Sequence, residues 1–250
     1  MTVVAPAPTS SSASAPEARV EETAPVASQF VQYLFLKVDS EWRRLDAATQ
    51  ARGRTEFEHV VAAAAPGITT HAYSTLGLKA DAQLMLWWKS ANAVTVQDTL
   101  GALLATGLGK YCEIAHSLWG LTRPSIYTKR RTTQEQAVDE TTRLQYLVVY
   151  PFSKTIEWYL MSRDARQGMM NEHMRIGHDF GDVRQVLLYT TGLDDQEFIV
   201  AYETDSLERH QDLVIALRST EARRYTLRDT PIFTAVHRPL RDALALLGPR

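Results

Sequence analysis

Strand-like and helix-like hydrophobic patterns alternate along the chain and occur in the same order in its two halves. Each half begins with a short, strongly apolar run, over 29–38 and over 145–152, which predicts a strand. A longer stretch follows in which apolar residues recur every three to four positions, over 39–65 and over 162–180, which predicts a helix. Ser162 is the expected N-cap of the second helix.

The following stretch of each half also repeats. From Ser74 and from Thr190, small polar residues lead to Gly-Leu, a short acidic turn, a hydrophobic run and a second helical pattern. Gly77 and Gly192 lie in the turns and suit a connection between two strands. Each half therefore predicts the order β-α-β-β-α-β, which is that of the ferredoxin-like unit.

The sheet of a ferredoxin-like unit covers one face with its own helices and leaves the other face open. Two units in one chain can lay their open faces together, so we predict an α+β fold in which two ferredoxin-like β-α-β-β-α-β repeats form a dimeric α+β barrel within one chain. The predicted divisions are a disordered tail over 1–27, a first repeat over 28–120, a connector over 121–144 and a second repeat over 145–250.

Charge and composition narrow the class of protein. The 250 residues include 27 basic and 29 acidic side chains, with no long run of one sign, which argues against a nucleic-acid partner or an anionic membrane surface. No apolar run approaches the ~18 residues of a membrane span, and residues 1–27 lack the apolar segment of a secretory signal. Cys112 is the sole cysteine, which suits a reducing compartment. We expect a cytoplasmic protein.

His173 is a polar residue at a position of the helical pattern where an apolar side chain is expected, so it is a candidate ligand. It shares a helix face with Met169, Met170, Ile176 and Phe180. The residues alone leave two interpretations open: a packed histidine with one hydrogen bond, which is the more common case, or a ligand for something lying against this face. His178 points about 140° away around the helix. A metal on His173 would therefore bring its other ligands with it, as a haem does.

Four blocks of the second half, in this order and at this spacing, resemble the chlorite dismutase superfamily. They are VVYPFSKTIEWYLM (148–161), MMNEHMRIGHDF (169–180), VLLYTTGLDDQEFIVAYET (186–204) and ALRSTEARRYTLRDTPIF (216–233). The resemblance extends over about residues 28–245 and is closest to the coproheme decarboxylases of haem synthesis. It implies the two-repeat fold, assembly as a ring-shaped homopentamer, and haem in the second repeat.

The resemblance also implies residues that hold the haem. His173 matches the ligand of the iron, and Met170 and Trp158 would contact the porphyrin. Glu221 matches a carboxylate that hydrogen-bonds the far ring nitrogen of that histidine and fixes its tautomer. From the sequence alone, Glu221 is equally well explained as an exposed residue at a helix end.

Gln185 and Tyr150 distinguish the branches of the superfamily. Counted back from the Gly-Leu-Asp-Asp turn, Gln185 stands where chlorite dismutases carry an arginine above the haem, whereas a register slip of one residue would place Arg184 there. Tyr150 matches the tyrosine of the decarboxylases that becomes a radical, and Lys154 matches a lysine near the reacting propionate. Candidates to hold the other propionates are Arg130, Arg131, Arg223 and Arg224.

The implied function is the last step of haem b synthesis. Coproheme would be both substrate and redox centre, hydrogen peroxide the oxidant, and haem b the product of two oxidative decarboxylations. Gln185 argues against chlorite dismutase, which splits chlorite to chloride and dioxygen and benefits from a cation above the iron. A non-catalytic haem-binding or haem-transfer protein is the third possibility. Whether a ferrochelatase is a direct partner stays open.

Overall fold

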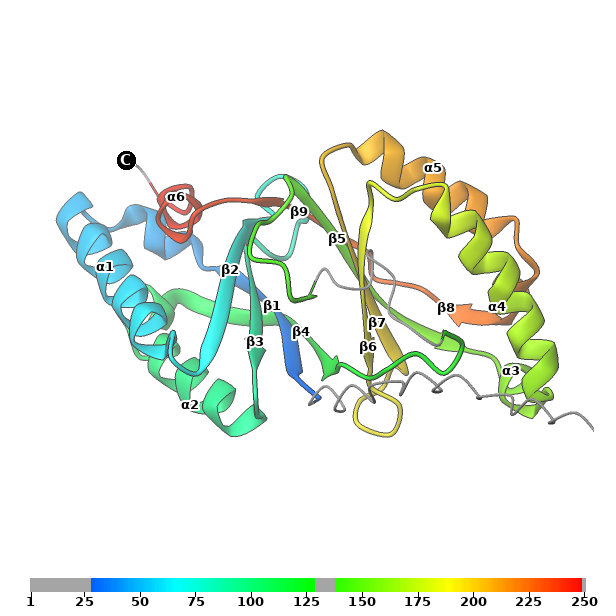
Figure 1. Ribbon diagram of the computed structural model, residues 1–250. Coiled ribbons are helices and arrows are strands. Elements are labelled where there is room, and N and C mark those ends of the chain that lie inside the picture. The colour runs from blue at the N-terminus through cyan, green and yellow to red at the C-terminus, as the bar shows by residue number, and fades with distance from the viewer. Residues whose placement is uncertain (1–27, 129–137, 249–250) are drawn as a thin grey trace, which may run out of the picture.

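The computed structural model describes residues 28–128 and 138–248 (Figure 1). In the first half the elements are β1 (Phe30–Val38), a 3-10 turn η1 (Ser40–Arg44), α1 (Ala47–Ala64), β2 (Ile68–Ser74), β3 (Leu84–Ser90), α2 (Ala93–Leu104), η2 (Gly109–Tyr111) and β4 (Cys112–Leu121). In the second half they are β5 (Tyr146–Lys154), α3 (Ile156–Leu160), α4 (Arg163–His178), β6 (Arg184–Tyr189), β7 (Phe198–Thr204), α5 (Leu207–Arg218), η4 (Glu221–Tyr225), β8 (Thr226–Arg228), β9 (Phe233–His237) and α6 (Leu240–Ala245).

The strands form one nine-stranded sheet in the order β7-β6-β4-β1-β3-β2-β9-β5-β8, and β7 also pairs with β5. This second pairing closes the sheet into a barrel, to which β8 is attached at one side. Two narrow seams join the halves: β4 meets β6 at Leu121 and Tyr189, and β2 meets β9 through Tyr73 and Ser74. The predicted α+β fold of two repeats in one barrel is confirmed.

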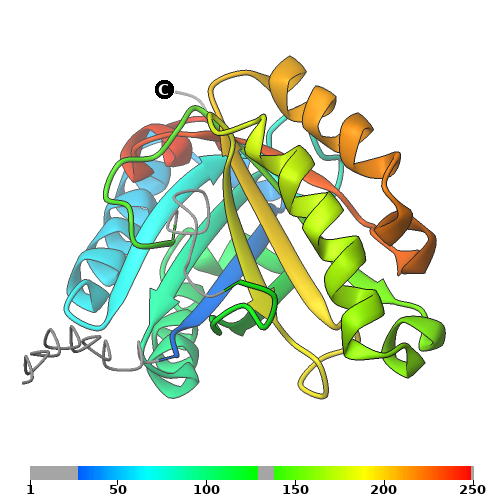
Figure 2. The ribbon, with the colours of Figure 1, turned by 45° about the vertical axis from the view of Figure 1, so that its right-hand side comes forward.

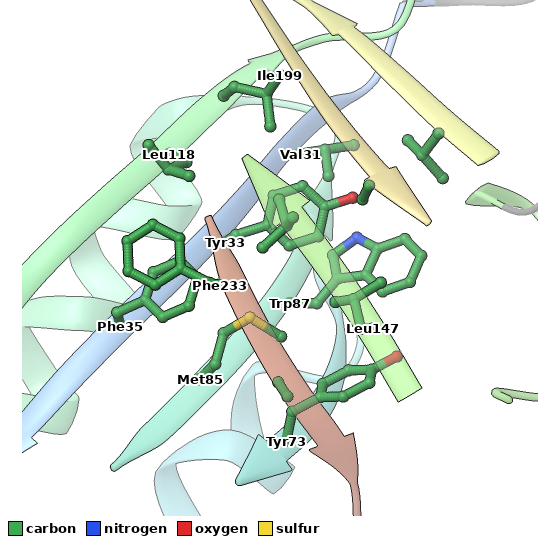
Figure 3. Packing of buried hydrophobic residues seen from close by; sticks show 14 of the residues in the cluster. Val31, Tyr33, Phe35, Tyr73, Met85, Trp87, Leu118, Leu147, Ile199 and Phe233 are labelled. Carbon is green, nitrogen blue, oxygen red and sulfur yellow. The ribbon is translucent and has the colours of Figure 1, made fainter. Parts of the chain in front are cut away.

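Alternation along the strands sends every second side chain into the barrel. The interior core takes residues from both halves, and Figure 3 shows the side chains of β1, β3 and β9 meeting those of β5 and β7. Phe35 of β1 stacks on Phe233 of β9 with ring centres 4.1 Å apart. Because the interior is shared in this way, burying it stabilises the two halves as one body.

The helices lie on the outside of the barrel in two groups (Figures 1 and 2). The helices α1, α2 and α6 cover the outer face of the first half, with Trp42 and Phe57 fully buried beneath them. The helix α6 comes from the last stretch of the chain but packs on this first-half core through Ala243 and Leu244. The helices α4 and α5 cover the outer face of the second half.

Local capping sets several helix boundaries. The carboxylate of Asp46 accepts a hydrogen bond from the backbone N–H of Thr49 at 2.9 Å, so the helix predicted over 39–65 is divided into η1 and α1. The hydroxyl of Ser162 accepts from the N–H of Ala165 at 3.2 Å, which confirms the predicted N-cap of α4. Gly77 and Gly192 have φ of 79° and 76°, a conformation that glycine adopts without strain.

The division of the chain into a tail, two repeats and a connector stays a prediction. Residues 1–27 and 129–137 lie outside the described part of the chain. Within the described part, no helix is both long enough and apolar enough to span a bilayer.

Candidate functional site

A cavity of about 300 Å³ lies between α4 and α5 and the outer face of β5, β6 and β7. It is of the size of small-molecule sites in proteins. Six of the predicted site residues line it, namely Tyr150, Lys154, Trp158, Met170, His173 and Gln185. The structure therefore brings together residues that lie up to 35 positions apart in the sequence (Tyr150 to Gln185).

The helix α4 forms the outer wall of the cavity, and none of its residues is buried. Met170, His173 and Met174 are only half-buried although they face the protein. A helix that turns sulfur and carbon atoms toward a cavity gains little from the hydrophobic effect until something fills the space. This arrangement fits a flat apolar ligand between α4 and the sheet.

The imidazole of His173 makes no hydrogen bond or ion pair to any of the described residues. Burial and, to a smaller extent, the charge of the nearby Lys154 lower its pKa from 6.5 to about 4. A lowered pKa keeps the ring neutral at pH 7, with a lone pair available to a metal. The interpretation of His173 as a satisfied core histidine therefore lacks the hydrogen bond that it requires.

The register of β6 decides which side chain faces His173 from the sheet. Gln185, Leu187 and Tyr189 line the cavity, whereas Val186 and Leu188 belong to the barrel interior. Arg184 points to the other face, where its guanidinium donates to the carbonyl of Thr142 at 2.8 Å. A neutral amide, and not a guanidinium, is therefore the polar group of β6 in the cavity.

Tyr150 and Lys154 reach the cavity from β5. Burial raises the pKa of the Tyr150 hydroxyl, and its ring lies 6.1 Å from that of Tyr202. The ammonium of Lys154 donates to the carbonyl of Ala222 at 3.4 Å and lies 4.5 Å from the ring centre of Trp158. Burial and, to a smaller extent, the charge of Arg223 lower the pKa of Lys154 from 10.5 to about 8, so the amine is still largely charged at pH 7.

Glu221 stands apart from the other predicted site residues. Its side chain is exposed, it does not line the cavity, and its carboxylate pairs with the Nε of Arg224 at 3.4 Å. Its backbone N–H donates to the carboxylate of Glu172 at 3.1 Å. Within residues 28–128 and 138–248, no hydrogen bond joins Glu221 to His173. The carboxylate that raises the pKa of His173 is that of its neighbour Glu172.

The arginines predicted to hold propionates also differ in whether they line the cavity. Arg223 lines the cavity and pairs with Asp229 at 2.6 Å, while Arg224 is exposed and does not line it. Arg130 and Arg131 lie outside the described residues.

Sequence reasoning missed other residues of the cavity, among them Tyr127, Tyr159 and Arg166. Arg166 precedes His173 by seven residues, which is two turns, so both lie on the same face of α4. This spacing is a signal that could have identified Arg166. Tyr127 and Tyr159 carry no such signal, because a loop and the short helix α3 place them.

The residues present fit a porphyrin but do not form a metal site of their own. In the described part of the chain, no group of three or more His, Cys, Asp or Glu side chains could hold a metal ion. His173 supplies one nitrogen at the wall of an apolar cavity. This is what an iron porphyrin requires of the protein, since the macrocycle provides four ligands itself.

Comparisons with known proteins indicate the family of this chain. The family model of chlorite dismutase matches residues 50–238. A coproheme decarboxylase of Mycolicibacterium smegmatis is 34% identical over 176 residues, which are 70% of this chain and 75% of that protein. A chlorite dismutase of Ideonella dechloratans is 24% identical over 229 residues, 88% of this chain and 80% of that protein.

A solved structure extends the likeness to three dimensions. The structure of chlorite dismutase from Candidatus Nitrospira defluvii in complex with imidazole superposes with a TM-score of 0.80 at 25% identity, covering 88% of this chain and 94% of that one. With a family model that matches most of the chain and a relative above 30% identity, the chain belongs to the chlorite dismutase family.

Proposed function

We propose that this protein is a peroxide-dependent coproheme decarboxylase that makes haem b from iron-coproporphyrin. The observation that carries the proposal is the composition of one cavity. A neutral His173 lines one wall, and the opposite sheet supplies the uncharged Gln185, the buried hydroxyl of Tyr150 and the ammonium of Lys154. The 34% identical coproheme decarboxylase supports the same assignment.

The residues that would hold the porphyrin lie on α4 and on the short helix α3. His173 would bind the iron, and Met170 and Trp158 would contact the macrocycle. The iron porphyrin, when bound, supplies the redox chemistry by which hydrogen peroxide oxidises the substrate. Gln185 can donate and accept hydrogen bonds above the iron without adding charge.

Tyr150 and Lys154 would act on the propionate. For each propionic acid group, hydrogen peroxide is reduced to two molecules of water while the side chain loses carbon dioxide and becomes a vinyl group. Tyr150 would pass one electron and one proton away and then take a hydrogen atom from the propionate carbon next to the ring. The second oxidising equivalent of the peroxide would remove the remaining electron as the carboxylate leaves as carbon dioxide. Lys154 would hold the carboxylate as its counter-ion until carbon dioxide leaves.

Chlorite dismutase is the second candidate, and the family model and the structural match over 88% of the chain favour it. Its chemistry keeps a reactive anion near the iron, a task for which a fixed positive charge is suited. In the cavity, β6 offers the amide of Gln185, and the guanidinium of Arg184 lies on the other face. The decarboxylase is therefore the assignment that the cavity supports better.

A titration of the purified protein with ferric coproheme, followed by additions of hydrogen peroxide, tests the proposal. We expect a shift of the Soret band on binding, and then the loss of two carboxyl groups in sequence, seen by chromatography and mass as a three-propionate intermediate and haem b. Sustained dioxygen release from chlorite without decarboxylation would assign the dismutase. Binding with only bleaching by peroxide would assign a haem carrier.

A further inference from the structure

Among the described residues, one cation of the cavity has neither a counter-ion nor a hydrogen-bond partner. Four basic side chains line the cavity, namely Lys154, Arg166, Arg218 and Arg223. Arg218 and Arg223 share the carboxylate of Asp229, at 3.6 and 2.6 Å. Lys154 donates to the carbonyl of Ala222 and the hydroxyl of Thr226, at 3.4 and 3.5 Å.

The guanidinium of Arg166 differs from these three. Its Nε is buried and has no hydrogen-bond partner, and none of the described residues forms an ion pair with it. A buried donor of a charged group costs free energy if it stays unpaired. The carboxylate that acts on Tyr159, that of Glu197, is already engaged, because it accepts the backbone N–H of Lys154 at 2.7 Å and the hydroxyl of Tyr159.

Two tyrosines accompany Arg166 at its end of the cavity. Tyr127 and Tyr159 line the same cavity as Arg166. Burial raises the pKa of both hydroxyls, and the positive charge of Arg166 opposes this shift. The adjacent Gln167 fixes the Tyr127 segment against α4 by donating to the carbonyl of Tyr127 at 3.1 Å. Because the hydroxyl of Tyr159 is engaged by Glu197, the guanidinium of Arg166 and the hydroxyl of Tyr127 are the donor set for an anion, and the planar guanidinium matches a carboxylate.

The position of Arg166 along α4 indicates which anion. Seven residues at ~1.5 Å each separate the Cα atoms of Arg166 and His173 by about 10 Å along one helix face. A macrocycle centred on His173 would therefore extend its rim toward Arg166. We infer that Arg166, with Tyr127, forms a binding subsite for a peripheral carboxylate of the porphyrin. This inference rests on the proposed function for its ligand.

Binding of metal-free coproporphyrin tests the subsite without turnover, because the probe has four carboxylates and no iron. Affinity is measured by fluorescence titration for the wild type, Arg166→Met and Arg166→Lys, at low and at moderate salt. We expect Arg166→Met to bind about tenfold more weakly and with a smaller dependence on salt. Arg166→Lys should recover part of the affinity, since it keeps the charge and loses the planar geometry.

Arg163→Met is the matched control. Arg163 lies one turn earlier on α4, is exposed and does not line the cavity. Its replacement by Met therefore removes one positive charge, as Arg166→Met does, but leaves the proposed subsite intact. We expect its affinity to stay within about twofold of the wild type. Circular dichroism of each variant separates loss of binding from loss of folding, and Arg166→Lys keeps the test decisive if Arg166→Met folds poorly.

The outcomes separate the subsite from the proposed function. Equal affinity of Arg166→Met and the wild type for coproporphyrin would overturn the subsite and leave the decarboxylase to the peroxide experiment. Weaker binding by Arg166→Met in a protein that never decarboxylates coproheme would support the subsite and reject the decarboxylase. A wild type that binds neither metal-free coproporphyrin nor ferric coproheme would overturn both.

Discussion

The guanidinium of Arg143 lies 3.1 Å from the carboxylate of Glu203, and both side chains are only 1% exposed. The pair lies in the barrel interior, where Arg143 stacks over the ring of Trp87 at 4.6 Å and the hydroxyl of Tyr73 donates to Glu203 at 3.2 Å. Arg143 precedes β5, and Tyr73 and Trp87 come from the first half of the chain. The ion pair and its neighbours therefore connect the two halves through the core.

Removing one partner of this pair should be costly. Glu203→Gln leaves the cation of Arg143 buried without its counter-ion, and we expect a loss of about 3–5 kcal/mol in the free energy of unfolding. The double variant Arg143→Met/Glu203→Gln should lose less than the two single variants together. Lys37→Met, which breaks an exposed pair with Glu113, should cost only about 0–1 kcal/mol. Denaturant unfolding measures all four, and an unchanged Glu203→Gln would contradict the prediction.

The seam between β4 and β6 depends on a glycine. A Cβ added at Gly120 would lie 2.7 Å from the Cγ2 of Thr190 and 3.0 Å from the Cβ of Leu188. We expect Gly120→Ala to lose about 1–3 kcal/mol by overpacking. Gly101→Ala, in the exposed interior of α2 with nothing within 4 Å, should instead gain about 1 kcal/mol from helix propensity. Thermal unfolding of both variants checks the opposite signs.

The sequence predicted the barrel because its period-two strands and glycine turns are local signals. The alternation around Gln185 assigned that residue to one face and Arg184 to the other, and the structure places them so. The division of the helix predicted over 39–65 was missed, because Asp46 acts as a cap only once the chain turns there. The single contact pair of the β4–β6 seam, Leu121 and Tyr189, joins residues 68 positions apart and has no local signal.

The site was predictable only where one helix or strand carries the pattern. His173 and Met170 lie on the apolar helix face that the pattern predicted, whereas Tyr150 and Lys154 were assigned to the site by resemblance alone. Glu221 was expected near His173 by resemblance, but it lies on η4, whose orientation depends on how the chain leaves α5. Its carboxylate turns to Arg224. The Tyr127 and Arg166 contact depends on how the loop after β4 crosses α4, which no periodicity encodes.

His173→Gln should separate iron binding from porphyrin binding. The variant keeps a polar side chain on α4 but lacks the imidazole, so ferric coproheme should bind with a Soret band different from that of the wild type. The affinities of His173→Gln and the wild type for metal-free coproporphyrin should agree within about threefold, because this probe has no iron for the imidazole to bind. His59→Gln, on the exposed side of α1, is the control. Identical ferric spectra for His173→Gln and wild type would contradict the role of His173.

Tyr150→Phe should abolish decarboxylation while leaving binding intact. The substitution removes one hydroxyl from a buried ring, so the cavity keeps its shape, and ferric coproheme should bind within about threefold of the wild type. The yield of haem b with peroxide should fall by at least about a hundredfold, because phenylalanine cannot pass on a proton and an electron. Tyr146→Phe, on the same strand but outside the cavity, should retain full activity. Haem b formed at an unchanged rate by Tyr150→Phe would exclude the radical role.

Lys154 should make porphyrin binding depend on pH. Its pKa of about 8 in the free protein means that the amine is charged at pH 7 and loses its proton as the pH rises through 8. A carboxylate bound beside the amine favours the charged form, so the pKa in the complex is higher than in the free protein. By linkage, affinity is then constant below pH 8 and falls above it, by at most about tenfold per pH unit.

Metal-free coproporphyrin is the suitable probe because it has no iron to bind hydroxide, and its carboxylates are already charged in this range. Lys154→Met should bind more weakly at pH 7 and show no such decrease, and a decrease of the same size in both proteins would assign the titration to another group.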